Sequence, residues 1–436
     1  MALVEECLRQ IERHDRALNA FITVTAESAR ATAAAADRDI AAGGWRGPLH
    51  GVPISIKDLI DMEGLPTTAG SNLRRQHRAS ASAPVVTRLE DAGAVIVGKT
   101  NLHEFAFGTT SEDSAFGPVR NPYDSARAAG GSSGGAAAAI VAGMCHASVG
   151  TDTGGSVRIP AAACGLVGFK PPFDGIPCDG VVPLSASFDH VGPLALSVQD
   201  AWLMYQAMRA NPRPGSLLDV PLSGRRLGLL RRYFAERLED GVDAVFAAAV
   251  ETLRNAGASI VEVEIPHADQ IQPIYLHVVL PEAATYHATS LERHPEAYTP
   301  NVRIRLEMGR YVLAEDYLRA LRGRELLRAE VRRALADVDV LVLPTLPIAA
   351  PLIGATTARI GGAEEPVRNA MLRGTQLFNM TGHPAITIPC GLTPAGLPCG
   401  LQLVADHAES TALFQLAAAC ERQMGGASGS EFGGSG

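Results

Sequence analysis

The stretch from residue 130 to 160, GGSSGGAAAAIVAGMCHASVGTDTGGSVRIP, constrains the fold of this chain more than any other. It contains two serine turns framed by glycines, at 130–135 and 153–156, with almost no charge between them. Glycine lacks a Cβ, so another backbone or a carbonyl group can approach a serine beside it. The segment between the turns, AAAAIVAG, consists of strong helix formers that end at a glycine. It predicts a short buried helix just after Ser132, whose free N–H groups favour negative charge.

The second turn offers a row of backbone N–H groups. It follows a strand-like segment at 146–150 and contains two adjacent glycines. Consecutive N–H groups on a turn can hold the oxyanion that forms when a carbonyl is attacked. Asp152 and Arg158 flank the turn, and we expect them to form an ion pair that fixes it. The expected oxyanion-hole residues are Thr153, Gly154, Gly155 and Ser156.

A lysine stands in an apolar segment upstream, PLHGVPISIKDLID at 48–61. The apolar pattern predicts a buried strand that carries Lys57 in its second half. In one interpretation Lys57 pairs with Asp58 or Asp61 at the surface, as most lysines would. In the other it is buried, which is costly unless the amine is neutral or paired. We favour burial, because the neighbours Ile54, Ile56, Leu59 and Ile60 are apolar. Desolvation would lower the pKa of the amine and make it a base near neutral pH.

These motifs resemble the amidase signature family of serine hydrolases. Two long motifs in the family's order and with similar spacing make the resemblance specific, and it extends from about Leu3 to about Gln423. The matching segments are GVPISIKD (51–58), GGSSGG (130–135), GTDTGGSVRIPA (150–161), CG (164–165) and GFKP (168–171).

The resemblance implies a mechanism for three of these residues. Ser156 would be the nucleophile, Ser132 a second serine on a cis Gly131–Ser132 peptide, and Lys57 the base. Neutral Lys57 would take the proton of Ser132 while Ser132 takes that of Ser156, and water would release the resulting acyl-enzyme. None of the twelve histidines stands in a motif that a histidine triad would need. The supporting residues would be Gly131, Ser133, Asp152 and Arg158.

Strand and helix patterns alternate outside the motifs. Residues 83–108 read as helix, strand and helix, and residues 225–265 as strand, helix and strand. This order predicts βαβ units. With the resemblance, it gives an α/β fold: an α/β/α sandwich around a large mixed, twisted sheet.

We expect a single domain over residues 1–424. Within it, a core motif region covers about 48–200, and a variable, largely helical region covers about 274–336. The tail at 425–436, GGASGSEFGGSG, has the composition of a linker or tag. Five residues of the helical region could be pocket walls or ordinary core, and we favour core: Leu280, Tyr286, Tyr298, Met308 and Tyr311.

Composition narrows the class of protein. The 436 residues are 47% hydrophobic and 19% charged, which indicates a globular protein with a large core. The net charge of −8 argues against a nucleic-acid partner. Seven scattered cysteines without a CxxC pair suggest neither disulfides nor zinc, and no apolar run is long enough to span a membrane. The sequence therefore predicts a soluble cytoplasmic protein, and leaves open whether it forms a homodimer.

Together these features predict a hydrolase that cleaves a C–N bond next to a carbonyl, in a small-molecule amide, anilide or carbamate. Linear amides and urethanes both satisfy the mechanism, and no metal or organic cofactor is implied. Two alternatives remain at this point. One is the amidase component of a tRNA-dependent amidotransferase, which makes ammonia from glutamine. The other is a non-catalytic relative that only binds, although such a protein would have lost Lys57 or one of the serines.

Overall fold

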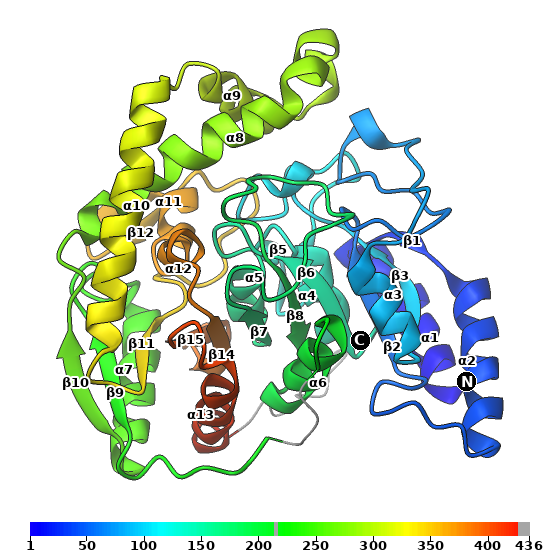
Figure 1. Cartoon of the computed structure of the whole chain (residues 1–436), viewed down its shortest axis with the longest axis horizontal. Coiled ribbons are helices and arrows are strands. Elements are labelled where there is room, and N and C mark those ends of the chain that lie inside the picture. The colour runs from blue at the N-terminus through cyan, green and yellow to red at the C-terminus, as the bar shows by residue number, and fades with distance from the viewer. Residues whose placement is uncertain (213–216, 426–436) are drawn as a thin grey trace.

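One mixed sheet of eleven strands runs through the molecule (Figure 1). The structure is a computed structural model that describes residues 1–212 and 217–425. In spatial order the strands are β1 (Phe21–Val24), β3 (Val95–Thr100), β2 (Pro53–Lys57), β6 (Ala147–Thr151), β8 (Val191–Ala195), β7 (Val167–Lys170), β14 (Ala385–Leu392), β15 (Pro398–Val404), β11 (Val340–Pro344), β9 (Arg226–Leu230) and β10 (Ser259–Val263). Strand β2 is parallel to both β3 and β6, and β9 is parallel to both β10 and β11. The other neighbours are antiparallel.

Helices cover the sheet on both faces. On one face four helices pack in succession, namely α3 (Pro84–Asp91), α6 (Val198–Met208), α13 (Ser410–Gln423) and α7 (Asp240–Asn255). The other layer contains α1 (Ala2–Leu18), α2 (Ala26–Ala41), α4 (Gly134–Val141), α5 (Arg158–Ala163) and α12 (Gln376–Thr381). This is the predicted α/β/α arrangement around a mixed sheet.

Three helices from the variable region extend past the sheet (Figure 1). They are α8 (Ile271–Arg293), α9 (Pro300–Gly309) and α10 (Ala314–Leu335), and the shorter α11 (Val367–Leu372) follows in the chain. Leu280 and Tyr298 are buried, as expected of core residues. The core interpretation is wrong for three others, because Tyr286, Met308 and Tyr311 are 45%, 54% and 81% exposed.

The remaining elements are short. Two ribbons pair β4 (Arg120–Asn121) with β5 (Asp124–Ala128), and β12 (Thr357–Ile360) with β13 (Ala363–Pro366). Single 3₁₀ turns occupy Asn72–Arg74, Glu104–Ala106, Ala268–Gln270 and Pro295–Ala297.

The helix expected after β3 is absent from this described segment. Only the 3₁₀ turn Glu104–Ala106 forms there, and Phe105 and Ala106 have positive φ values of 50° and 58°. The physical reason lies at Asn101, at the start of the expected helix. Its Nδ2 donates to the carbonyls of Asn19 and Gly117, each at 3.1 Å, so the side chain ties two distant loops together. The chain therefore continues as an irregular segment along one side of the site described below.

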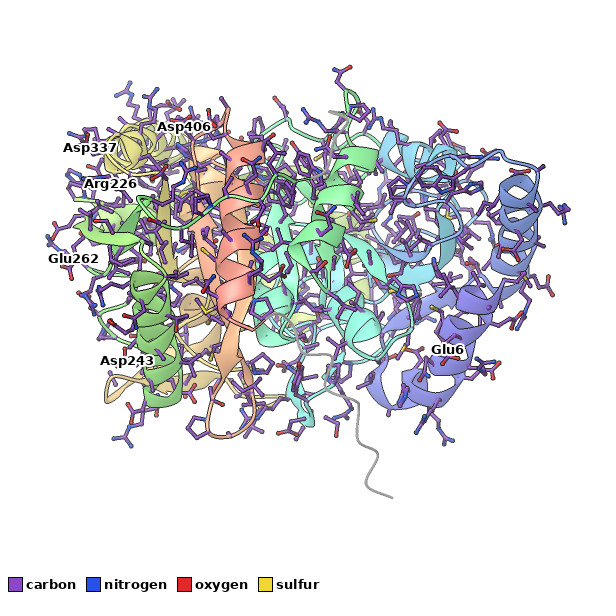
Figure 2. All side chains as sticks on the ribbon, turned by 90° about the horizontal axis from the view of Figure 1, so that it is seen from below. Glu6, Arg226, Asp243, Glu262, Asp337 and Asp406 are labelled. Atoms are coloured by element: carbon purple, nitrogen blue, oxygen red, sulfur yellow. The ribbon has the colours of Figure 1, made fainter. Side chains whose placement is uncertain are left out.

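The outer edge strand carries charge. In β10, Ser259 and Glu262 are exposed, and Glu262 pairs with Arg231 at 3.1 Å. Figure 2 shows Glu262, Arg226 and Asp337 projecting outward at this end of the molecule. Charged side chains on an edge strand disfavour pairing with another chain.

Several other expectations concern the chain as a whole. All seven cysteines are free. No helix in the described part of the chain has the length and apolar character that a bilayer crossing requires. Of the predicted tail, only Gly425 lies inside the described residues, and 426–436 fall outside them.

Candidate active site

Lys57 ends β2, an interior strand between β3 and β6, and its side chain is fully buried. Its Nζ lies 2.7 Å from the Oγ of Ser132 and 2.9 Å from the Oγ1 of Thr151. Thr151 ends β6, and since β2 and β6 are parallel neighbours, their carboxyl ends meet at one edge of the sheet. The surface-pairing interpretation of Lys57 is wrong, because Asp58 instead pairs with Lys99 at 2.9 Å.

Burial changes the acid–base chemistry of this lysine. Removing the ammonium from water lowers the pKa of Lys57 to about 7, although the nearby carboxylates of Asp152 and Asp189 partly oppose the shift. About half of the amines are therefore neutral near pH 7. A neutral amine can donate an N–H to Thr151 and accept the hydroxyl proton of Ser132.

The two serine turns are in contact. The backbone N–H of Ser133 donates to the carbonyl of Ser156 at 3.3 Å, and the Gly131–Ser132 peptide is cis. A Cβ on Gly131 would lie 2.7 Å from the backbone nitrogen of Ser111, so no larger residue fits there. Ser132 is fully buried, whereas Ser156 retains 6% of its exposure. Ser132 is thus the innermost of the two serines and the one that contacts Lys57.

The turn at 153–156 is held from two sides. The Oγ1 of Thr375 donates to the Gly154 carbonyl at 2.5 Å, and the Oγ1 of Thr153 donates to Asp189 Oδ1 at 2.5 Å. Gly155 has a φ of 133°, and a Cβ there would lie 2.3 Å from Thr375 Oγ1. Only glycine satisfies both conditions. The backbone N–H groups of the turn are therefore fixed in direction.

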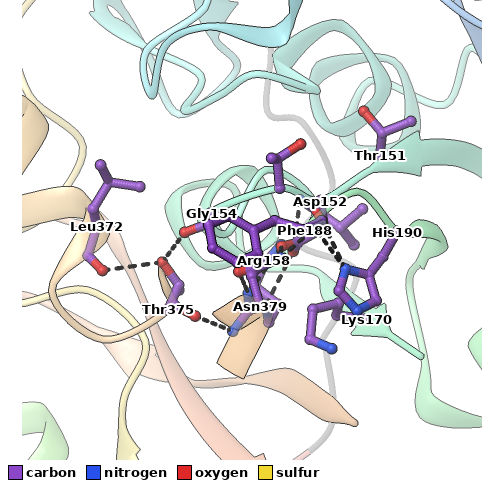
Figure 3. Close-up of polar contacts among 12 residues, drawn as sticks. Thr151, Asp152, Gly154, Arg158, Lys170, Phe188, His190, Leu372, Thr375 and Asn379 are labelled. Carbon is purple, nitrogen blue, oxygen red and sulfur yellow. Dashed lines mark hydrogen bonds and ion pairs between the residues drawn. The ribbon is translucent and has the colours of Figure 1, made fainter. Parts of the chain in front are cut away.

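The predicted ion pair lies directly behind this turn (Figure 3). Arg158 Nη2 contacts Asp152 Oδ1 at 2.8 Å, Nε contacts Oδ2 at 3.0 Å, and both side chains are fully buried. The same guanidinium donates to Asn379 and Gln402, and Asn379 also donates to Asp152. Burial disfavours the Asp152 carboxylate, yet Arg158 overcomes this and lowers its pKa well below the usual range. The pair is thus fully charged and has many hydrogen bonds.

Two other buried bases lie near the pair. Lys170 Nζ donates to the Pro171 carbonyl at 2.7 Å, and His190 Nδ1 contacts the Phe188 carbonyl at 2.7 Å. Burial lowers the pKa of each well below its ordinary value. Neither lines the cleft that contains Ser156.

A narrow cleft opens over Ser156, and its cavity volume is only about 10 Å³. Its walls combine apolar and aromatic side chains with polar ones, and Arg368 is the charged residue among them. A larger cavity of about 1000 Å³ between α3 and α6 contains none of the predicted site residues. Within the described residues, no three His, Cys, Asp or Glu side chains are grouped to hold a metal ion. The cleft is lined by Ala106, Phe107, Gly108, Thr109, Thr153, Gly154, Ser156, Leu184, Tyr275, Arg368 and Leu372.

Sequence reasoning located the serines, the lysine and the ion pair but missed their partners. Thr151 lies inside the GTDTGGS motif, so its place beside the second serine turn was visible in the sequence. Thr375 and Tyr275 carry no local signal, because they reach the site only through the pairing of distant strands and helices. The same is true of Arg368, which stands in a polar segment that reads as surface.

The chain is similar to known proteins over most of its length. The Amidase family model matches residues 2–414. An amidase of Pseudomonas putida is 42% identical over 409 residues, which cover 91% of this chain and 86% of that protein. A glutamyl-tRNA(Gln) amidotransferase subunit of Anaeromyxobacter sp. (strain K) is 38% identical, over 97% of this chain and 92% of its own. A crystal structure of an amidase superimposes with a TM-score of 0.91 at 37% identity, covering 97% of this chain and 95% of that one.

Proposed function

Because the chain belongs to the Amidase family of C–N hydrolases, we propose that it cleaves small amides, anilides or carbamates through an acyl-enzyme on Ser156. Ser132 and Lys57 serve as the proton relay. The observation that carries this proposal is the 2.7 Å contact between a buried lysine of lowered pKa and a serine adjacent to the Ser156 turn. Such a contact supplies a base where a histidine is found in other serine hydrolases.

The relay works by two coupled proton transfers. Neutral Lys57 accepts the proton of Ser132 as Ser132 accepts that of Ser156, and the Ser156 oxygen attacks the carbonyl carbon. The tetrahedral intermediate carries a negative oxygen, which the N–H groups of the 153–156 turn stabilise. The protons then return along the same path to the leaving amine. Water repeats the sequence on the acyl-enzyme and releases the carboxylic acid or, from a carbamate whose amine has left, the carbonic acid monoester.

Besides the proton relay, the reaction requires N–H groups that are fixed in direction toward the oxyanion. The hydrogen bonds from Thr375 and Thr153, with the buried Asp152–Arg158 pair, hold the turn before any substrate arrives. Donors that are already oriented need no reorganisation as charge develops, and each is worth roughly 3 to 4 kcal/mol of barrier.

The cleft walls favour flat apolar substituents. Phe107 and Tyr275 contribute rings, and Leu184 and Leu372 contribute aliphatic surface. Tyr275 is itself stacked on Phe188, with ring centroids 5.6 Å apart. Anilides and aryl carbamates therefore fit this cleft better than strongly charged substrates.

A panel of chromogenic amides, anilides, carbamates and esters tests the proposal. We expect the wild-type protein to hydrolyse several members and the Ser156→Ala variant to hydrolyse none above background. Ser28→Ala, on the exterior of α2, is the matched serine control and should behave as wild type. Turnover by Ser156→Ala close to that of wild type would remove Ser156 as the nucleophile.

Similarity to the amidotransferase subunit favours glutamine hydrolysis as a second candidate. Free glutamine carries both a carboxylate and an ammonium group. Arg368 could bind the carboxylate, but the residues that line the cleft include no acid to bind the ammonium. We therefore expect ammonia release from glutamine to be far slower than anilide hydrolysis by the isolated chain. The reverse order would support the amidotransferase function.

A further inference from the structure

Asp189 connects the oxyanion turn to the cleft wall. It is a half-buried carboxylate in the segment before β8. Its Oδ1 accepts the hydroxyl of Thr153 at 2.5 Å, and its Oδ2 accepts the backbone N–H groups of Leu184 and Ser185 at 2.9 and 3.1 Å. Both Thr153 and Leu184 line the cleft over Ser156. One side chain thus fixes two walls of the cleft relative to each other.

The same segment is attached to the variable helices at its outer side. Glu282 on α8 accepts the hydroxyls of Ser185 and Ser187 at 2.6 and 2.5 Å. Tyr317 on α10 donates to Glu282 at 3.0 Å. A continuous chain of hydrogen bonds therefore runs from the helical region through the cleft wall to the oxyanion turn.

We propose that Asp189 is a positioning residue that holds Thr153 and its turn in the geometry needed to stabilise the oxyanion, with Glu282 holding the opposite end of the same segment. The inference rests on the proposed function of the 153–156 turn. Asp189 contacts neither Lys57 nor Ser132 by a hydrogen bond, so it holds the geometry of the site through the residues it orients. Its charge also raises the pKa of Lys57, so kcat is compared on the plateau above neutral pH, where the amine is neutral in every variant. A small displacement of prearranged donors is enough to slow an acyl transfer.

The two ends of the chain of hydrogen bonds should affect different kinetic parameters. Removing the Asp189 carboxylate frees Thr153 and should lower kcat, because the oxyanion exists only after substrate has bound. Removing Glu282 frees the segment that carries Leu184 but leaves the Thr153 contact, and should mainly raise KM. A role limited to general stability would lower the amount of folded protein without separating kcat from KM.

The experiment measures kcat and KM for one anilide with four variants. Asp189→Ala should lower kcat about tenfold or more with KM changed by less than about threefold. Asp189→Asn should recover most of the loss, because an amide can accept from the two N–H groups and donate to Thr153 Oγ1. Glu282→Ala should raise KM with little change in kcat. Glu421→Ala is the matched control, since Glu421 is also half-buried and accepts a backbone N–H, from Val198, far from the cleft.

A covalent probe separates this inference from the proposed function. An aryl phosphonate ester should label Ser156 in the wild type and react more slowly with Asp189→Ala, with the labelled peptide identified by mass spectrometry. Failure to label Ser156 in the wild type would overturn the proposed function itself. Two results would refute the positioning role while leaving Ser156 as the nucleophile. In the first, Ser156 is labelled in the wild type, but Asp189→Ala reacts with the probe and turns over substrate as fast as wild type. In the second, the kcat of Asp189→Asn is no higher than that of Asp189→Ala.

Discussion

A buried lysine is the residue on which the chemistry depends. In water its amine would be protonated at every physiological pH and could not accept a proton. The fully buried position at the end of β2 lowers its pKa to about 7, and no carboxylate among the described residues forms an ion pair with it. Thr151 and Ser132 then provide one acceptor and one donor, which suits a neutral amine.

The pH dependence of the reaction follows from this pKa. The neutral amine is the active form, so activity should be present above pH 7 and lost as the pH falls through about 7. For an uncharged anilide we expect kcat/KM to drop about tenfold per pH unit on the acidic side and to level off above neutrality. Rates measured from about pH 5 to about pH 9 at constant ionic strength check this. A flat profile across that range would show that no group of pKa near 7 controls the step.

Replacing the lysine should discriminate between leaving groups. Lys57→Met keeps the apolar stem and removes the amine, so the relay can neither take nor return a proton. We expect anilide turnover to fall about 10³-fold or more, and turnover of a p-nitrophenyl ester, whose leaving group needs no proton, to fall far less. Lys99→Met is the comparison, because Lys99 is equally buried but bound to Asp58. Equal losses on amide and ester with Lys57→Met would contradict the return of a proton to the amine.

At the scale of elements, the turn before α5 depends on the ion pair behind it. Asp152 accepts the backbone N–H groups of Val157 and Arg158 as well as the guanidinium. Arg158 in turn reaches Thr375 and Gln402, which lie 217 and 244 residues further along the chain. The serine turn, α12 and β15 are therefore joined around one buried charge pair.

Breaking that pair should cost stability. Arg158→Met leaves the Asp152 carboxylate buried and uncompensated, and we expect the free energy of unfolding to fall by about 3 to 5 kcal/mol. Arg231→Met breaks an exposed pair with Glu262 and should cost at most about 1 kcal/mol. Urea unfolding of the two variants beside wild type measures the difference. Similar losses in both would mean that the buried pair contributes no more than a surface one.

Sequence reasoning succeeded at this scale where the signal was local. The helix after Ser132, the strand that carries Lys57 and the strand, helix and strand at 225–265 all have clear local signals, and the structure confirms them. The helix expected at 100–108 fails, because the side chain of Asn101 forms bonds to remote carbonyls. A local sequence pattern cannot predict hydrogen bonds to such distant partners.

The difference between local and distant signals also explains which site residues the sequence did not predict. The glycine-framed serines stand out in the sequence, whereas Thr375 and Tyr275 gain their places only through tertiary packing. Exposure was also misjudged for Met308 and Tyr311, because the helical region extends beyond the sheet and presents these side chains to solvent.

At the scale of the whole molecule, the long sheet connects all of these parts. It begins with β1 near the N-terminus and ends with β10. One hydrophobic cluster extends from Leu49 to Cys420, and a second, smaller one packs α1, α2 and α4 against the same sheet. Strands β2, β3, β6, β7 and β8 of the core motif region lie inside the sheet, with β1 on one side of them and β14 on the other. This arrangement supports our proposal of a single domain.

A single domain should unfold as a unit. Trp202 is buried in α6, so its fluorescence reports the N-terminal half of the sheet, while far-UV circular dichroism reports helices throughout the chain. We expect both signals to change with the same midpoint in urea. Two separated transitions would indicate two independent domains.

The central claim is that a lysine–serine relay activates Ser156, and trapping the acyl-enzyme tests it most directly. The wild-type protein is mixed with an activated aryl carbamate, quenched in acid, digested and mapped by mass spectrometry. The account predicts one carbamoyl group, located on Ser156 with loss of the phenol, and slower formation in Lys57→Met, because the relay can no longer take the Ser156 proton. A carbamoyl group on another residue, or equally fast formation without the lysine, would contradict it.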